Sequence, residues 1–249
     1  MKIRLDKLLL AKNLAPTRQK AQALIGAGQV LVNNRLADKA GAMVDDSCTL
    51  EVKESCPYVS RGGYKLEAGL EFFNIKPAGL TCLDIGASTG GFSDCLLQHG
   101  ASKIYSVDVG YGQLAWKLRQ DSRIVVMERT NARYLSREDI AEPIDLAVID
   151  ASFISLKLLI PALLPFFREN VSILALIKPQ FEAGRGKVGK GGVVRDPSLH
   201  QEVIDEIISF CATLGLESQG ITPSPILGPK GNKEFLIHLI SHSSGETID

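Results

Sequence analysis

Short apolar runs alternate with amphipathic stretches along the last two thirds of the chain. From Leu80 onward, apolar runs cover residues 80–86, 103–109, 123–127, 145–150, 172–178, 216–222 and 234–240. The segments between them favour helices over residues 92–98, 113–119, 155–167 and 198–214. Buried strands that alternate with helices are typical of a parallel sheet with helices on both faces. The pattern therefore predicts an α/β domain over residues 63–243.

The N-terminal stretch has a different pattern and predicts a small α+β module over residues 1–53. Two short helices are expected, which bury Leu5, Leu8 and Leu9 in the first and Ala21, Leu24 and Ile25 in the second. Alternating Val30 and Val32, a turn at Asn33 and Asn34, and a strand-like run at 49–52 predict a small sheet. Residues 54–62 are interpreted as a linker, and residues 244–249 as a tail.

Composition is that of a globular protein, with 45% hydrophobic and 22% charged residues. The longest apolar stretch, residues 152–167, contains Lys157, Pro161 and Pro165 and is too short to span a bilayer comfortably. The N-terminus does not resemble a secretory signal. Five cysteines form no CxxC pair, which favours reduced, buried thiols. These features predict a cytoplasmic protein without a membrane span.

Charge is distributed unevenly, although the net charge is zero. Residues 1–39 contain eight basic and two acidic residues, and the rest of the chain contains 20 basic and 26 acidic residues. A basic module on an otherwise acidic chain indicates a polyanionic partner. A solvated surface without a partner is the alternative that charge alone leaves open.

The segment RLDKLLLAKNLAPTRQKAQALIGAGQVLVNNR resembles the alpha-L RNA-binding domain of a small-subunit ribosomal protein, pseudouridine synthases and tyrosyl-tRNA synthetases. The resemblance implies that the second helix and the turn after it present basic side chains to RNA phosphates. The residues at the matching and neighbouring positions are Lys7, Lys12, Arg18, Lys20 and Arg35. Contacts with phosphates position a protein on RNA without reading its sequence.

A glycine-rich segment, LDIGASTGGFSD, joins the first strand of the larger domain to its first helix. Such a turn lets the backbone approach a ligand closely at a helix N-terminus. The spacing of Gly86, Gly90 and Gly91 differs from the GxGxxG of nicotinamide sites. Asp84 would repel a pyrophosphate, but it can face the ammonium group of an amino acid. These features favour S-adenosylmethionine (AdoMet) as the cofactor.

Two further strand ends supply candidate cofactor contacts. Asp108 ends the second strand, where an acid can accept both ribose hydroxyls of an adenosine. Asn131 follows the third strand, where AdoMet enzymes place a polar side chain against the adenine. The candidate cofactor-binding residues are Asp84, Gly86, Ala87, Ser88, Thr89, Gly90, Phe92, Asp108, Val109 and Asn131. No metal ion is expected.

Residues 184–191, GRGKVGKG, nearly spell a phosphate-binding P-loop. They lack the Ser or Thr that ligates magnesium, and they do not open a helix. We interpret residues 183–195 as a basic loop that closes over RNA, and a plain loop is the alternative. The candidate RNA contacts outside the N-terminal module are Arg61, Arg185 and Lys187.

The methyl acceptor is constrained by motifs that the chain lacks. An Asn/Asp-Pro-Pro-Tyr tetrapeptide after the fourth strand would indicate N-methylation, but that segment reads VIDASFISL. A Pro-Cys dipeptide would indicate methylation at C5 of a pyrimidine, but no Pro-Cys occurs. A hydroxyl acceptor needs a base to remove its proton, and a lysine can do this. Asp150 and Lys178 follow the fourth and fifth apolar strands, at the edge where ligands bind in open α/β sheets. A strand-end salt bridge is the structural alternative.

The larger domain resembles the ribose methyltransferases that include the heat-shock rRNA enzyme FtsJ, and the whole chain resembles the TlyA family, also called haemolysin A. The resemblance rests on SRGGYKL, LDIGASTGGFSD, VIDASFISL, LIKPQFEAGR and GNKEFL. It implies a Rossmann-like AdoMet-dependent methyltransferase fold with an antiparallel last strand, which acts on ribose 2′-hydroxyls of ribosomal RNA. It also implies a catalytic tetrad of Lys65, Asp150, Lys178 and Glu234. One departure is residues 56–59, CPYV, where parts of the family carry Arg-x-Trp-Val.

Within this tetrad, we expect Lys178 to be the general base, since partial burial and the positive field of Lys65 weaken its hold on a proton. Asp150 would orient Lys178, and Lys65 and Glu234 would position the ribose. Three alternatives stay open: a membrane-lysing protein, an RNA-binding protein with an inactive methyltransferase fold, and a methyltransferase that acts on a base or on tRNA.

Overall fold

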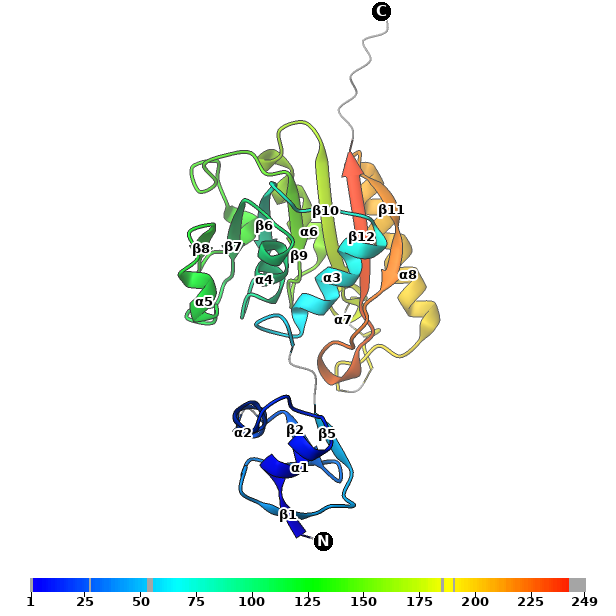
Figure 1. Ribbon diagram of the computed structural model, residues 1–249. Coiled ribbons are helices and arrows are strands. Elements are labelled where there is room, and N and C mark those ends of the chain that lie inside the picture. Colours follow the sequence, from blue (N-terminus) through cyan, green and yellow to red (C-terminus); the bar gives the residue numbers. More distant parts are fainter. Residues whose placement is uncertain (1, 27, 53–55, 185, 190, 242–249) are drawn as a thin grey trace, which may run out of the picture. The chain divides into compact units, whose positions relative to one another are not determined.

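The computed structural model describes residues 2–26, 28–52, 56–184, 186–189 and 191–241 (Figure 1). The chain divides into two compact units, Met1–Pro57 and Tyr58–Asp249. We refer to them as the N-terminal unit and the C-terminal unit and describe each by itself. Residues 58–62, which the sequence pattern assigns to the linker, belong to the C-terminal unit, where the Tyr58 side chain is buried and α3 begins at Gly62.

The N-terminal unit contains the two predicted helices and the predicted turn. Its elements are β1 (Lys2–Arg4), α1 (Leu5–Ala11), α2 (Arg18–Gly26), β2 (Val30–Val32), β3 (Arg35–Leu36), β4 (Met43–Asp45) and β5 (Leu50–Val52). Leu5, Leu9, Ala21, Ile25 and Val30 form its core. Strands β3, β2 and β5 form one sheet, while β1 pairs with β4. Residues 33 and 34 both have a positive φ, which suits the tight turn between β2 and β3.

The C-terminal unit is built around a seven-stranded sheet within the described residues. Its strands are β6 (Thr81–Ile85), β7 (Lys103–Val107), β8 (Ile124–Met127), β9 (Leu146–Ile149), β10 (Val171–Ile177), β11 (Glu217–Pro223) and β12 (Phe235–Ser241). Their order is β11-β12-β10-β9-β6-β7-β8, and only β12 runs antiparallel to its neighbours. This arrangement confirms the predicted mostly parallel, Rossmann-like sheet with an antiparallel last strand.

Helices cover both faces of this sheet. They are α3 (Gly62–Phe72), α4 (Gly91–Gln98), α5 (Trp116–Arg119), α6 (Leu156–Leu163), α7 (Pro179–Glu182) and α8 (Pro197–Thr213), with the 3-10 turns η1 (Ala132–Tyr134), η2 (Leu164–Phe166) and η3 (Pro229–Gly231). Figure 1 shows α3 and α4 on the near face and α6 and α8 on the far face. Ile173 and Ala175 belong to the core that includes α6 and α8, whereas Leu174 lies against Gly69 of α3. Alternate side chains of β10 are therefore buried on opposite faces, which explains its continuous apolar run.

Two predicted helices are shorter than expected. The helix over residues 113–119 begins only at Trp116, because side chains hold the backbone before it in a loop: Gly110 N donates to Asp108 Oδ1 and Gly112 N to Glu128 Oε1. The helix over residues 155–167 ends at Leu163 and continues as the η2 turn, in which Pro165 is an early residue. Proline cannot donate the backbone hydrogen bond that would extend the α-helix.

Candidate active site

A cavity of about 770 Å³ opens at the carboxyl ends of β6 and β7, and we call it the cofactor cavity. Gly86 and Ser88, Asp108 and Val109, and Asn131 are among its lining residues. The Asp108 carboxylate is held at the rim because its Oδ2 accepts a hydrogen bond from Ser88 N and its Oδ1 accepts one from Gly110 N. Each carboxylate oxygen keeps a further lone pair for a ligand hydroxyl.

Gly86 is the point where the chain turns from β6 toward α4. It has a φ of +86°, which L side chains rarely adopt, and a Cβ at this position would lie 2.8 Å from the main-chain oxygen of Asp150. Glycine is therefore required on both grounds. Gly90, at the N-cap of α4, has a φ of +97°, and a Cβ there would lie 2.2 Å from Leu118 Cδ1. The glycine-rich segment is thus shaped by close approaches within the fold.

Asp84 occupies a buried position beneath this turn and does not line the cofactor cavity. Its Oδ2 accepts a hydrogen bond of 2.6 Å from Ser93 Oγ. Burial raises the pKa of Asp84 to about 7, although the Ser93 hydrogen bond opposes this shift. A direct contact between Asp84 and the ammonium group of a cofactor stays a prediction.

The remaining candidate cofactor residues divide between two neighbouring places. Ala87 and Phe92 line a second cavity, described below, together with Gly86 and Ser88. Thr89 and Gly90 line neither cavity, and the Thr89 carbonyl accepts a hydrogen bond from Ala115 N. The glycine-rich turn therefore faces two cavities.

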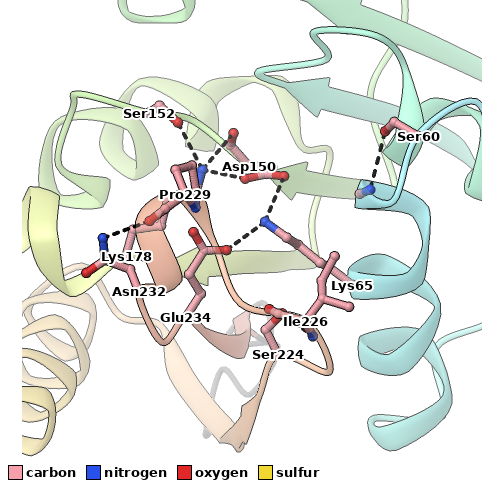
Figure 2. Close-up of polar contacts among 11 residues, drawn as sticks. Ser60, Lys65, Asp150, Ser152, Lys178, Ser224, Ile226, Pro229, Asn232 and Glu234 are labelled. Atoms are coloured by element: carbon pink, nitrogen blue, oxygen red, sulfur yellow. Dashed lines mark hydrogen bonds and ion pairs between the residues drawn. The ribbon is translucent and has the colours of Figure 1, made fainter. Parts of the chain in front are cut away.

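Four charged side chains from four elements form a chain of ion pairs (Figure 2). Lys178 Nζ lies 2.5 Å from Asp150 Oδ1, and Lys65 Nζ lies 3.7 Å from the other carboxylate oxygen, Oδ2. Lys65 Nζ also contacts Glu234 Oε2 at 2.6 Å. Lys65, Lys178 and Glu234 are 8%, 5% and 2% exposed. The sequence-predicted tetrad is therefore assembled in space, with two positive and two negative charges that compensate one another.

The fold explains how residues so distant in sequence meet. Asp150 directly follows β9 and Lys178 directly follows β10, and these neighbouring parallel strands end at the same edge of the sheet. Strand β12 is antiparallel to β10 and pairs Phe235 with Ile177. The residue before Phe235, Glu234, is therefore brought beside the residue after Ile177, Lys178. Lys65 reaches the group from the second turn of α3.

Lys178 has two further hydrogen bonds that the sequence does not indicate. Its Nζ donates to Ser152 Oγ at 3.1 Å and to the main-chain oxygen of Asp150 at 3.3 Å. A lysine ammonium has three N–H donors, and three acceptors thus surround this one. Ser152 is exposed and lines the cofactor cavity, so it connects the buried amine with that cavity.

A second cavity, of about 560 Å³, adjoins the first, and we call it the acceptor cavity. It shares Gly86, Ser88 and Asp150 with the cofactor cavity, and Lys65 and Arg61 line it as well. Residues 226–230 form another part of its wall. Because Asp150 lines both cavities, this member of the ion-paired group lies where a molecule in one cavity would meet a molecule in the other. Lys178 and Glu234 line neither cavity and are connected to the cavities through Asp150 and Lys65.

The predicted RNA contacts of the N-terminal unit are all exposed. Two of them have partners within the unit: Arg18 pairs with the buried Asp6 at 3.0 Å, and Lys12 Nζ donates to the main-chain oxygen of Cys48. In the C-terminal unit, Lys187 forms an ion pair with Glu202. Arg185 and Lys190 lie outside the described residues, and the contacts of all these residues with RNA stay predictions.

Sequence reasoning missed two polar residues of this region, Ser152 and Asn232. Ser152 lies in the VIDASFISL segment and Asn232 in GNKEFL, but an isolated serine or asparagine carries no spacing signal. The Asn232 side chain is 2% exposed and forms three hydrogen bonds with main-chain atoms. Only the tertiary structure distinguishes it from a surface loop residue.

Comparisons with known proteins identify the two domains. Residues 58–240 match the FtsJ-like methyltransferase family, and residues 3–47 match the S4 domain. None of the helices in the described part of the chain is both long and apolar enough to cross a membrane.

Two curated relatives and one solved structure resemble nearly the whole chain. The 16S/23S rRNA (cytidine-2′-O)-methyltransferase TlyA of Mycobacterium tuberculosis is 47% identical over 95% of this chain and 89% of its own length. Hemolysin A of Brachyspira hyodysenteriae is 42% identical over 96% of this chain and all of its own length. A structure of a hemolysin from Streptococcus thermophilus is 44% identical, with a TM-score of 0.76 over 98% of this chain and 90% of that chain. The chain belongs to the FtsJ-like methyltransferases, and within them to the TlyA family with an N-terminal S4 domain.

Proposed function

We propose that this protein transfers a methyl group from AdoMet to a ribose 2′-hydroxyl of ribosomal RNA, at a cytidine. The substrate is suggested by the relative from M. tuberculosis, whose name specifies cytidine-2′-O methylation of 16S and 23S rRNA. The observation that carries the proposal is the ion-paired group of Lys65, Asp150, Lys178 and Glu234, whose member Asp150 lines both the cofactor cavity and the acceptor cavity.

The residues of the cofactor cavity fit AdoMet. Asp108 presents a carboxylate fixed by two backbone N–H groups, a geometry suited to ribose hydroxyls. Gly86 leaves space next to the Asp150 main chain that any side chain would fill. Asn131 lines the cavity, and its Oδ1 accepts a hydrogen bond from Arg133 N, which fixes the side chain. Bound AdoMet supplies an electrophilic methyl group, and the protein supplies position and a base.

Lys178 is the proposed general base, acting from its Nζ. It must first release one proton, after which the neutral amine offers a lone pair to the 2′-hydroxyl. One of its three polar contacts, two hydrogen bonds and one ion pair, must open for this approach. The bond to Ser152 Oγ is the candidate, because the other two acceptors belong to Asp150, which is also its ion-pair partner. The proton of the hydroxyl would then pass to Lys178 Nζ as the oxygen takes the methyl group, and the bond from sulfur to methyl would break to leave neutral S-adenosylhomocysteine.

Asp150 would hold the amine in line with the acceptor, and Lys65 would keep the Asp150 carboxylate in place through Oδ2. Glu234 balances the charge of Lys65 inside the fold. Such compensation is needed because an unpaired buried charge is strongly unfavourable. The S4 domain would hold the RNA by its phosphates through exposed basic residues.

The test uses the full chain, tritiated AdoMet, and ribosomal subunits that lack the modification, with tRNA as a matched acceptor. After nuclease digestion, the label is expected in 2′-O-methylcytidine from ribosomal RNA. Label in a base, or in tRNA with none in ribosomal RNA, would contradict the proposal. Absence of transfer, combined with binding of AdoMet, would support the inactive-fold alternative.

A further inference from the structure

The wall of the acceptor cavity is a loop fixed by its own hydrogen bonds, residues 224–234, which we call the wall loop. Its two ends are joined by Ser224 N, which donates to the Glu234 main-chain oxygen at 2.9 Å. Within the loop, Gly228 N donates to the Asn232 main-chain oxygen at 2.9 Å. The Glu234 carboxylate packs so closely on this loop that a Cβ at Gly228 would lie 2.0 Å from Glu234 Oε1. A shift of the wall loop would therefore displace Glu234 and its partner Lys65.

Asn232 connects the wall loop with the end of the loop over residues 183–195, which we call the glycine-rich loop and which is distinct from the glycine-rich turn after β6. Its Oδ1 accepts a hydrogen bond from Val194 N at 3.0 Å, and its Nδ2 donates to the main-chain oxygens of Gly192 and Pro229 at 3.0 and 3.1 Å. Figure 2 shows Asn232 next to Pro229, on the wall loop that leads to Glu234. One buried side chain thus joins three backbone atoms from two loops.

The glycine-rich loop is itself anchored at this point. Val194 is 3% exposed, and its main-chain oxygen lies 3.0 Å from the Nε2 of His200, a buried residue of α8. Val194 is therefore fixed on both sides, by α8 and by Asn232. The second side-chain connection between the loops, from Lys230 Nζ to the Gly191 oxygen, is exposed to solvent and contributes less to rigidity.

The chemistry of these contacts requires an amide. An asparagine offers one oxygen acceptor and two N–H donors, and the structure uses all three. An aspartate could still accept from Val194 N, but its second oxygen would face the carbonyl oxygens of Gly192 and Pro229. A nearly isosteric replacement would therefore disturb this junction more than a truncation would.

We propose that Asn232 is a positioning residue for methyl transfer, which ties the wall loop to the glycine-rich loop and so sets the placement of Glu234 and the shape of the acceptor cavity. This inference rests on the proposed RNA methyltransferase function. Asn232 lines neither cavity, so its effect must pass through the wall loop. Replacement of Asn232 should therefore lower kcat/KM for RNA and leave the affinity for AdoMet unchanged.

The test compares Asn232→Ala and Asn232→Asp with the wild type and with Asp145→Ala as a matched control. Asp145 also joins two segments through a backbone hydrogen bond, from Thr81 N at 2.8 Å, but it lies at the opposite edge of the sheet. For Asn232→Ala, kcat/KM for ribosomal RNA is expected to fall by about 10- to 100-fold, since small misplacements at a reacting centre have effects of this size. The kcat/KM of Asn232→Asp should fall further. The AdoMet affinity of both variants, measured by calorimetry, should be unchanged. Asp145→Ala should lower the melting temperature without altering kcat/KM.

Three kinetic or binding results would overturn the inference: a wild-type kcat/KM in Asn232→Ala, an Asn232→Asp variant no worse than Asn232→Ala, or a parallel loss of AdoMet affinity. Hydrogen exchange at the Val194 amide separates this inference from the proposed function. If the wild type transfers no methyl group to RNA, the proposed function fails. If Asn232→Ala leaves exchange at Val194 and in residues 224–234 unchanged, the positioning role fails whatever the activity.

Discussion

Lysines serve different purposes in the two units of the chain. In the N-terminal unit, Lys7, Lys12 and Lys20 are exposed on a basic module. In the C-terminal unit, Lys65 is buried between Asp150 and Glu234, and Lys178 is buried beside Asp150. Exposed charges attract a polyanion over a distance, and salt screens them. Buried charges act over a few ångströms, and their geometry must be fixed because each was removed from water. The lysines proposed to bind RNA and the lysines proposed to act in catalysis thus lie in different units of the chain.

Replacement of Lys178 should have the largest effect on methyl transfer, and it tests the role of the buried lysines directly. Lys178→Ala removes the proposed base, so we expect methyl transfer to fall by about 10²- to 10⁴-fold. AdoMet binding should persist, because Lys178 does not line the cofactor cavity. Initial rates with tritiated AdoMet, together with calorimetric AdoMet affinity, measure both properties.

The matched control for this prediction is Lys157→Ala, which removes a surface lysine paired with Glu206 outside both cavities. It should leave the rate unchanged. Near-normal transfer by Lys178→Ala would show that the base is another group, and the contrast between buried and exposed lysines would then lose its chemical meaning.

Gly86→Ala should produce the next largest effect, and it should weaken the binding of AdoMet rather than the binding of RNA. The new Cβ would lie 2.8 Å from the Asp150 oxygen, in a backbone conformation with a φ of +86°. Strain of this kind amounts to roughly 1–3 kcal/mol, so AdoMet affinity should fall by about 10- to 100-fold. Gly79→Ala is a suitable control, since it has a φ of +79° with nothing within 4 Å of the added Cβ. Equal losses in the two variants would trace the effect to backbone strain alone.

Asp84 predicts a pH dependence of stability in the C-terminal unit. Its pKa is raised from 3.8 to about 7 in the folded protein, so the stability it contributes is complete below pH 4 and is lost as pH rises through 7. A shift of this size corresponds to at most roughly 4 kcal/mol. Asp84→Asn keeps an oxygen acceptor for Ser93 but does not ionise. The free energy of unfolding of this variant, relative to wild type, should therefore rise between pH 5 and pH 8.

Urea unfolding of both proteins at these two pH values measures this difference. A constant difference across the range would show that Asp84 is not the titrating group. The same experiment with Asp145→Asn is the control, because the Asp145 side chain accepts a single backbone hydrogen bond at an exposed position.

The smallest effect is expected from the exposed basic residues of the N-terminal unit. Lys20→Ala should weaken RNA binding by a factor of about 3 to 10 at low salt, and it should reduce the salt slope of the affinity by about one. The kcat at saturating RNA should not change. Filter binding over a range of salt concentrations measures the slope. A change in kcat with an unchanged slope would mean that Lys20 acts on the chemistry instead of on phosphates.

Much of the fold was readable from the sequence because buried parallel strands need continuous apolar runs. All seven strands of the main sheet lie within the runs predicted for them or within one residue of those runs. The strands β1, β3 and β4 were not predicted, since these two- or three-residue segments lack the alternating valines that mark β2, which is equally short. The early end of α6 and the late start of α5 depend on a proline and on side chains from distant segments.

The sequence by itself determined which residues were available for chemistry, because a charged residue after an apolar strand is unusual and because its motifs resemble those of a known family. The tertiary structure decided which residues meet. An antiparallel β12 places Glu234 beside Lys178, α3 brings Lys65 to Asp150, and the wall loop depends on Asn232. None of these contacts has a signature in sequence spacing, since each joins segments that are far apart along the chain. A buried ion pair depends on distance and burial, and only the folded chain sets these two quantities.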